Sequence, residues 1–286
     1  MVPAAFALFL RERRIPARFD EPLAPHTTFR VGGPADVLVE PRDEGELVEV
    51  LRAAGEQEIP LRILGGGANL LVRDEGVRGA VVRLSRLDGR RGDRVQAGRP
   101  LPRLVRETLR EGLGGLEALA GIPGTLGGAI RMNAGGRAGT IGDVVRAVEV
   151  LTLGGEFRRL PRPAVGFRYR GSALDGCVVV AAELELRPSP QAPERFASLL
   201  RDKRRTQPLD RCSAGCIFKN PPGQAAGRLI EACGLKGVRC GGARVSPRHA
   251  NFIVNEGGAT ASDILRLIDL IRKRVPVPLE LEVQVW

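Results

Sequence analysis

Three glycine-rich segments constrain the fold of this chain more than any other feature, because glycine lets the backbone approach other groups closely. The segments are Arg30–Pro34, Leu64–Leu71 and Gly121–Ala129. Bare backbone N–H groups in such segments can hold the phosphates of a nucleotide. Tight turns are the alternative explanation for any single glycine pair.

The second segment is not the dinucleotide-binding fingerprint of a Rossmann fold. Gly65 and Gly67 match its first two glycines, but Leu70 stands at the third. Gly76 and Gly79 then interrupt the stretch that should form the following helix. The segment also lacks the Lys-Ser/Thr ending of a P-loop. A dinucleotide held here therefore requires a different fold.

Hydrophobic periodicity predicts an α+β protein with at least two domains. Apolar spacing indicates helices over residues 46–54, 101–109, 194–205, 225–233 and 261–274. Runs of β-branched and apolar residues indicate strands over residues 61–64, 80–84, 144–153, 178–186, 251–255 and 281–286. Three prolines within residues 187–193 predict a linker between domains.

The basic charge points to an acidic partner. The 286 residues include 44 basic and 33 acidic ones, which gives a net charge of +11. The arginines are scattered and are not interleaved with aromatic residues, as a nucleic-acid stacking platform would require. We therefore expect a solvated basic surface, with a few cations reserved for a small substrate that carries phosphates and a carboxylate.

Cysteine and histidine usage argues against a metal site. The five cysteines form no CxxC pair and the chain has two histidines, so we expect no bound metal. An odd cysteine count indicates reduced thiols in the cytoplasm. The apolar run from Val2 to Leu10 precedes its arginines, the wrong order for a signal peptide, and is too short to span a membrane.

Residues 211–220 combine a thiol, a cation and an amide within five positions. Cys216 is followed by Lys219 and Asn220, and a nearby lysine can lower the pKa of a thiol. Such a thiol is a candidate general acid, with Ser213 a weaker candidate. A small buried hydrophobic side chain is the alternative role for a lone cysteine.

Two further segments carry candidate charged residues. Arg170 follows Tyr169, the single tyrosine of the chain, and its planar guanidinium suits a carboxylate or an enolate. Glu280 and Glu282 would share one face of a C-terminal strand. Solvent exposure is the alternative explanation for all three charges.

Taken in order from about residue 22 to 285, these segments strongly resemble the UDP-N-acetylenolpyruvoylglucosamine reductase (MurB) family. The resemblance depends on the ordered set Thr28–Gly33, Gly65–Val72, Gly114–Glu117, Gly121–Thr125, Met132–Gly135, Tyr169–Ser172, Ala214–Pro221, Gly241–Ala243, His249–Phe252 and Leu279–Val283. No long insertion follows Arg170, so the chain resembles the shorter of the two types in this family.

The resemblance implies an FAD-binding domain of the vanillyl-alcohol-oxidase (PCMH) type, in two subdomains, plus a C-terminal α+β substrate domain. The expected boundaries are residues 1–84 and 85–192 for the two FAD subdomains and 193–278 for the substrate domain. The C-terminal strand, residues 279–286, is expected to return to the second subdomain.

The resemblance implies a reaction of peptidoglycan synthesis. In this reaction, NADPH and FAD reduce UDP-N-acetylglucosamine enolpyruvate to UDP-N-acetylmuramate. The catalytic residues carried over are Arg170, Cys216 and Glu282. The FAD-binding residues carried over are Arg30, Gly65, Gly66, Gly67, Ala68, Asn69, Leu70, Ile122, Pro123, Gly124, Thr125, Gly128 and Ala129. Candidate substrate-binding residues are Tyr169, Arg205, Lys219 and Asn220. A cytoplasmic monomer that binds neither nucleic acid nor membrane is expected.

Cys216 departs from the family, which commonly has serine as the proton donor. A free thiol has a pKa of about 8.5, far below that of an alcohol, so it gives up a proton more readily. Two other functions stay open: an alcohol or sugar oxidase on the same cofactor fold, which would not consume NADPH, and a basic nucleic-acid-binding protein, which would carry no flavin.

Overall fold

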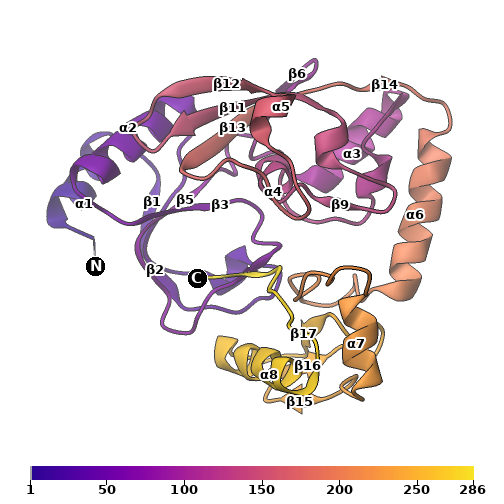
Figure 1. Cartoon of the computed structure of the whole chain (residues 1–286). Helices are drawn as coiled ribbons and strands as arrows, with labels where there is room; N and C mark the ends of the chain where they lie inside the picture. Colours follow the sequence, from indigo (N-terminus) through magenta and orange to yellow (C-terminus); the bar gives the residue numbers. More distant parts are fainter. Residues whose placement is uncertain (1) are drawn as a thin grey trace. The chain divides into compact units, whose positions relative to one another are not determined.

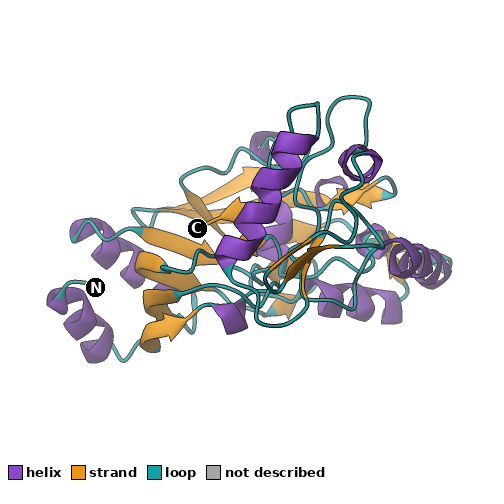
Figure 2. Cartoon of the chain, turned by 90° about the horizontal axis from the view of Figure 1, so that it is seen from below, coloured by secondary structure: helices purple, strands orange, loops and turns teal. Residues whose placement is uncertain are grey.

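The computed structural model describes residues 2–286 and divides into two compact units. Unit 1 comprises Met1–Glu21, Asp36–Gly66 and Arg78–Arg201. Unit 2 comprises Pro22–Ala35, Gly67–Val77 and Asp202–Trp286. Helices and strands alternate with loops along the chain (Figure 2). The second glycine-rich segment is thus divided between the units after Gly66.

A four-stranded sheet opens unit 1. Its order is β1-β2-β5-β3, with β3 and β5 parallel. Helix α2 begins after Asp43, whose side chain accepts a hydrogen bond from the N–H of Glu46 at 2.9 Å. Its buried face includes Leu47 and Leu51. The elements are α1 (Ala4–Glu12), β1 (Ala17–Pro22), β2 (Pro34–Val39), α2 (Glu44–Glu56), β3 (Leu61–Leu64) and β5 (Val77–Arg83).

A five-stranded antiparallel sheet forms the rest of the unit 1 core. Its order is β12-β11-β13-β7-β6, and helices α4 and α5 pack against its central strands β13 and β11 (Figure 1). The elements are β6 (Arg90–Arg91), β7 (Arg94–Gln96), α3 (Leu101–Arg110), α4 (Leu126–Arg131), β11 (Val145–Thr152), β12 (Phe157–Pro161), α5 (Arg162–Val165) and β13 (Cys177–Leu184).

Short elements connect these sheets. Strand β8 pairs antiparallel with β14, and β9 pairs antiparallel with β10. The elements are η2 (Glu117–Leu119), η3 (Ile141–Asp143), β8 (Leu113–Gly114), β9 (Gly135–Gly136), β10 (Gly139–Thr140) and β14 (Arg187–Pro188). Helix α6 (Ala192–Thr206) contains the boundary between the units, between Arg201 and Asp202.

Unit 2 has its own core around helix α8 and a three-stranded sheet, β15-β16-β17 (Figure 1). A capping box of Thr260 and Asp263 starts α8, and Ile264, Leu267 and Ile268 are buried on one face. The elements are η1 (Ala24–His26), β4 (Leu70–Leu71), α7 (Ala226–Ala232), β15 (Arg239–Cys240), β16 (Ala243–Val245), β17 (Ile253–Asn255), α8 (Ala261–Arg274) and β18 (Gln284–Val285).

The helices and strands expected from periodicity are confirmed, with two differences in how they connect. The proline-rich stretch is not an extended linker, because Pro188 pairs in β14 and Pro193 lies in the first turn of α6, where a helix needs no N–H donor. The C-terminal strand β18 pairs with β4, which precedes residue 85, and not with a strand of residues 85–192. Within residues 2–286, no helix combines the length and apolarity needed to cross a bilayer.

Candidate functional site

Two glycine-rich loops of unit 1 lie against each other, backbone to backbone. Gly65 and Gly66 follow β3, and Gly124 and Thr125 precede α4. A Cβ atom added to Gly66 would lie 2.5 Å from the Cα of Gly124, and one added to Gly65 would lie 2.7 Å from the Oγ1 of Thr125. No side chain larger than hydrogen fits between these loops. We call these four residues the glycine cradle.

The second loop of the cradle is fixed from both sides. Gly124 adopts φ +103°, which side chains disfavour, and its carbonyl accepts a hydrogen bond from the N–H of Leu101 at 2.9 Å. Thr125 caps α4 by accepting from the N–H of Gly128 at 3.5 Å. Gly128 is exposed, whereas the side chain of Ala129 packs into the core. The cradle is therefore a preformed backbone surface.

The remaining predicted cofactor residues have mixed roles. Ile122 is half-buried and Pro123 is exposed beside the cradle. In unit 2, Gly67 is buried with φ +59°, and its carbonyl accepts from the N–H of Thr28 at 3.0 Å. Arg30 is exposed, and its Nη1 donates to the carbonyl of Pro25 at 3.0 Å.

Asn69 and Leu70 hold the C-terminal segment. The Nδ2 of Asn69 donates to the carbonyl of Glu282 at 2.9 Å, and the carbonyl of Asn69 accepts from the N–H of Gln284 at 3.0 Å. Leu70 is buried in β4, which pairs with β18. Ala68, which precedes Asn69, is half-buried. The sequence motif therefore also fixes the backbone that carries Glu282.

Within unit 2, the structure brings the segments of Cys216 and Glu282 together. The carbonyl of Ile217, the residue after Cys216, accepts from the N–H of Glu282 at 2.8 Å. Phe218 and Leu281 form a β-bridge beside this bond. Both Cys216 and Glu282 are partly exposed. Arg170 belongs to unit 1, where its Nη1 donates to the carbonyl of Gly135 at 2.8 Å.

The predicted substrate residues are spread over both units. Tyr169 is exposed, and the guanidinium of Arg170 lies 5.3 Å from its ring centre. Lys219 pairs with the carboxylate of Glu280, and Asn220 accepts from the N–H of Ala226 at 3.0 Å. Arg205 is exposed on α6 and pairs with Asp202.

Asn251 was not assigned a role from the sequence, although it lies within the His249–Phe252 motif. Its buried side chain accepts from the N–H of Phe218 at 3.0 Å and donates to the carbonyl of Phe218 at 2.8 Å. Burial lowers the pKa of His249, whose Nδ1 lies 3.3 Å from the N–H of Asn251. An asparagine inside an apolar motif is the sequence signal for such a clamp.

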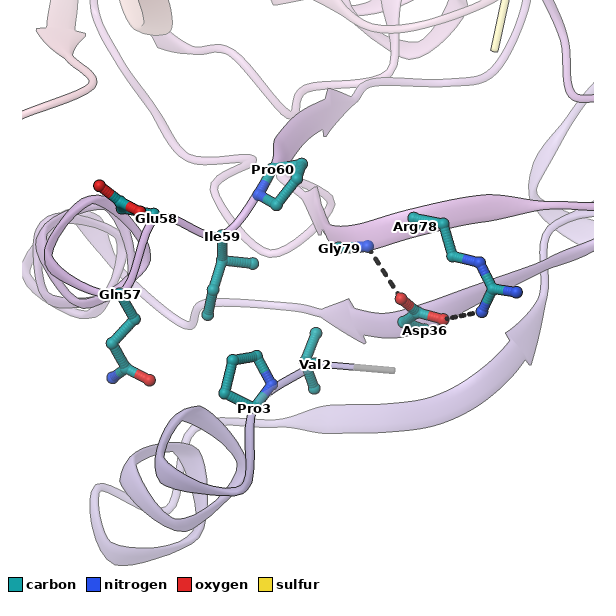
Figure 3. Close-up of a pocket in the computed structure, with 9 residues that line it drawn as sticks. All are labelled: Val2, Pro3, Asp36, Gln57, Glu58, Ile59, Pro60, Arg78 and Gly79. Atoms are coloured by element: carbon teal, nitrogen blue, oxygen red, sulfur yellow. Dashed lines mark hydrogen bonds and ion pairs between the residues drawn. The ribbon is translucent and has the colours of Figure 1, made fainter.

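A cavity of about 240 Å³ lies in unit 1 (Figure 3). Apolar side chains such as Val2 and Ile59 line it, and Asp36 accepts from Arg78 and from the N–H of Gly79 at its edge. None of the predicted site residues lines it. Among residues 2–286, no cluster of three His, Cys, Asp or Glu side chains could hold a metal ion.

Comparison with known proteins identifies the families to which two regions of the chain belong. Residues 35–161 match the FAD binding domain family, and residues 207–286 match the UDP-N-acetylenolpyruvoylglucosamine reductase, C-terminal domain, family. The UDP-N-acetylenolpyruvoylglucosamine reductase of Anaeromyxobacter sp. (strain Fw109-5) is 52% identical to this chain, covering 96% of this chain and 90% of that protein. The chain belongs to the UDP-N-acetylenolpyruvoylglucosamine reductase family.

Other relatives agree. The reductase of Moorella thermoacetica is 49% identical over 93% of this chain and 92% of its own length. The crystal structure of the UDP-N-acetylenolpyruvylglucosamine reductase from Thermus caldophilus matches with a TM-score of 0.86 and 44% identity, covering 96% of this chain and 99% of that one. Berberine bridge enzyme, with a TM-score of 0.52, 18% identity, and coverage of 66% of this chain and 44% of its own, shares the fold alone.

These matches confirm the family resemblance and the predicted fold class. The chain is an FAD-dependent oxidoreductase of this family, with a cofactor domain of the vanillyl-alcohol-oxidase type and a C-terminal reductase domain. The glycine cradle lies within the FAD-binding match, and Cys216 and Glu282 lie within the C-terminal match.

Proposed function

We propose that this enzyme uses NADPH to reduce the enolpyruvyl group of UDP-N-acetylglucosamine enolpyruvate, giving UDP-N-acetylmuramate for peptidoglycan synthesis. The observation that carries the proposal is the backbone pairing of residue 217 with residue 282. This pairing holds a thiol and a carboxyl on neighbouring segments, in a chain whose other unit carries the glycine cradle.

The glycine cradle fits a flavin nucleotide. Its bare backbone leaves room for a pyrophosphate to approach closely, and Ile122 to Ala129 would border the isoalloxazine. FAD, when bound, supplies the hydride chemistry, accepting a hydride from NADPH and passing it to the enolpyruvyl β-carbon. In this proposal residues 1–84 and 85–192 form the cofactor domain and residues 193–278 bind the substrate.

Arg170 and Glu282 would act on the substrate carboxylate. Addition of hydride at the β-carbon places negative charge on the α-carbon and its carboxylate, and a fixed guanidinium stabilises that charge. Cys216 would then donate its proton to the α-carbon. The balance is one hydride from NADPH and one proton from the thiol, which solvent restores.

Glu282 would serve best as a neutral acid. A nearby substrate carboxylate raises the pKa of a carboxyl by like-charge repulsion, so the carboxyl keeps its proton. The protonated carboxyl can then donate a hydrogen bond to the enolate. Replacement by glutamine should then retain part of the rate that replacement by alanine loses. Equal losses for Glu282→Gln and Glu282→Ala, measured as kcat, would contradict the neutral-acid role.

The remaining assignments concern the UDP-sugar. Lys219, Asn220, Arg205 and Tyr169 are proposed to bind it, because three of them lie on segments next to Cys216 or Arg170 and Arg205 lies on the basic end of α6. We propose a cytoplasmic monomer whose partners are the UDP-sugar and NADPH, without nucleic acid or membrane.

An anaerobic spectrum of the purified protein tests this function. Flavin absorbance should be present, should disappear when NADPH is added, and should return when the enolpyruvyl UDP-sugar is added. An alcohol that bleaches the flavin where NADPH does not would indicate the oxidase alternative. Absence of flavin, with salt-dependent binding to DNA or RNA, would indicate a nucleic-acid-binding protein.

A further inference from the structure

Arg170 occupies a backbone conformation that is costly for arginine. It is the third residue of a tight turn closed by Arg168 and Gly171, whose N–H groups donate to each other's carbonyls at 2.9 and 3.2 Å. Its φ is +55°, in the left-handed region that glycine and asparagine favour. Such a conformation persists only where surrounding contacts impose it.

Asn133 supplies one of those contacts. It follows α4, and its Nδ2 donates to the carbonyl of Arg168, the first residue of the turn, at 3.1 Å. Its Oδ1 accepts from the N–H of Gly142 at 3.1 Å. Because Oδ1 faces an N–H group and Nδ2 faces a carbonyl, the orientation of the amide is determined by its partners.

The guanidinium of Arg170 is held by a residue close to Asn133 in the chain. Arg170 Nη1 donates to the carbonyl of Gly135, two residues after Asn133. Asn133 therefore connects to the turn through its side chain and to the guanidinium's acceptor through its backbone. The backbone turn that contains Arg170 and the acceptor of its guanidinium are therefore both linked to Asn133.

Neighbouring residues pack closely around the Asn133 side chain. A Cβ atom added to Gly142 would lie 2.9 Å from the Oδ1 of Asn133 and 2.9 Å from the ring of Phe167. The N–H of Asn133 donates to the carbonyl of Ile130 at 3.1 Å, which ties it to the end of α4. Asn133 itself has φ +42°, which asparagine tolerates better than most residues.

We propose that Asn133 is a positioning residue that holds Arg170 in register with the substrate carboxylate. The inference rests on the proposed function of Arg170. Asn133 does not touch the substrate in this account. It sets the separation between the turn and Gly135, and hence the place of the guanidinium.

A double-mutant cycle in the FAD-loaded enzyme tests this. The probes are UDP-N-acetylmuramate, which carries the carboxylate, and UDP-N-acetylglucosamine, which lacks it, with dissociation constants measured by calorimetry. Asn133→Gly permits the positive φ but removes both side-chain bonds. Asn133→Asp keeps an acceptor for Gly142 and removes the donor to Arg168. Thr152→Ala, which loses a side-chain bond to the N–H of Glu156 in another turn, is the control.

The expected result is that both Asn133 variants weaken binding of the carboxylate ligand about tenfold and leave the other ligand unchanged. Arg170→Ala should show the same selective loss, and Asn133→Gly/Arg170→Ala no further loss. The rate at which substrate reoxidises the flavin should fall, while reduction by NADPH should not.

Three outcomes overturn the inference in different ways. If Arg170→Ala is selective but the Asn133 variants are not, Asn133 has no positioning role and the proposed function survives. Asn133→Asp with full affinity would show that the bond to Arg168 does not hold Arg170 in place, and the inference would fail. If Arg170→Ala itself leaves both ligands unaffected, the role proposed for Arg170 fails, and the inference fails with it.

Discussion

The two units present their predicted site residues in different ways. Unit 1 offers mainly backbone, the glycine cradle between two loops, supported by sheets of four and five strands. Unit 2 offers mainly side chains, on loops held by asparagine clamps and short strands. A backbone surface suits a cofactor common to many enzymes, and a side-chain surface suits one particular substrate. The backbone surface of unit 1 should be sensitive to added atoms, and the side-chain surface of unit 2 should be sensitive to the loss of hydrogen bonds.

The largest effect should come from adding a methyl group to the cradle. Gly66→Ala places a Cβ 2.5 Å from the Cα of Gly124, so the two loops must separate. We expect loss of bound flavin, measured by the absorbance of the purified protein. Gly55→Ala is the matched control, because its Cβ meets nothing within 4 Å in helix α2. Normal flavin content in Gly66→Ala would show that flavin binding does not need the bare backbone of the glycine cradle.

The next effect concerns the thiol of unit 2. Cys216→Ala should lower kcat about 100-fold, since loss of a general acid typically costs that much or more. Cys216→Ser should stay active, with the loss of rate at alkaline pH removed, because a serine hydroxyl does not ionise there. The kcat of each variant across pH 6–10 checks both expectations. A fully active Cys216→Ala would exclude the donor role.

A smaller effect is expected from the clamp on the Cys216 segment. Asn251→Ala leaves the buried N–H and C=O of Phe218 without their side-chain partner, which should lower the free energy of unfolding by about 2 kcal/mol. Thr260→Ala, which removes the N-cap of α8, should cost about 1 kcal/mol. Chemical denaturation compares them. Equal stability of Asn251→Ala and the unmodified enzyme would show that the segment needs no clamp.

The smallest effect should appear in unit 1 as an acid response. Hydrogen bonds from Arg159, followed by those from Arg146, lower the pKa of Glu183 to about 2 despite partial burial. Because the folded pKa lies below the unfolded value, the stabilisation is present above about pH 4 and is lost as the pH falls toward 2. Glu183→Gln should reduce stability by about 1 kcal/mol at pH 7. The difference from the unmodified enzyme should shrink steadily between pH 4 and pH 2, and a constant difference would contradict this origin.

The sequence predicted the elements with strong periodicity, whereas the roles of the site residues chosen for their chemistry stay predictions. Helix α8 was predicted with its capping box because both signals are local. The pairing of β18 with β4 could not be predicted, because strands of two residues carry no periodic signal and their partner lies more than 200 positions away. The roles of Asn133 and Asn251 were missed for a related reason: a clamp is defined by its distant partner, which spacing along the chain does not reveal.

Our central proposal is that the guanidinium of Arg170, the thiol of Cys216 and the carboxyl of Glu282 act on one enolpyruvyl group. A crystal structure of the FAD-loaded enzyme with UDP-N-acetylmuramate tests it most directly. We expect Arg170 and Glu282 to contact the carboxylate of the ligand and Cys216 Sγ to face its α-carbon. A ligand bound with that carboxylate in solvent, or with Cys216 turned away from the α-carbon, would contradict it.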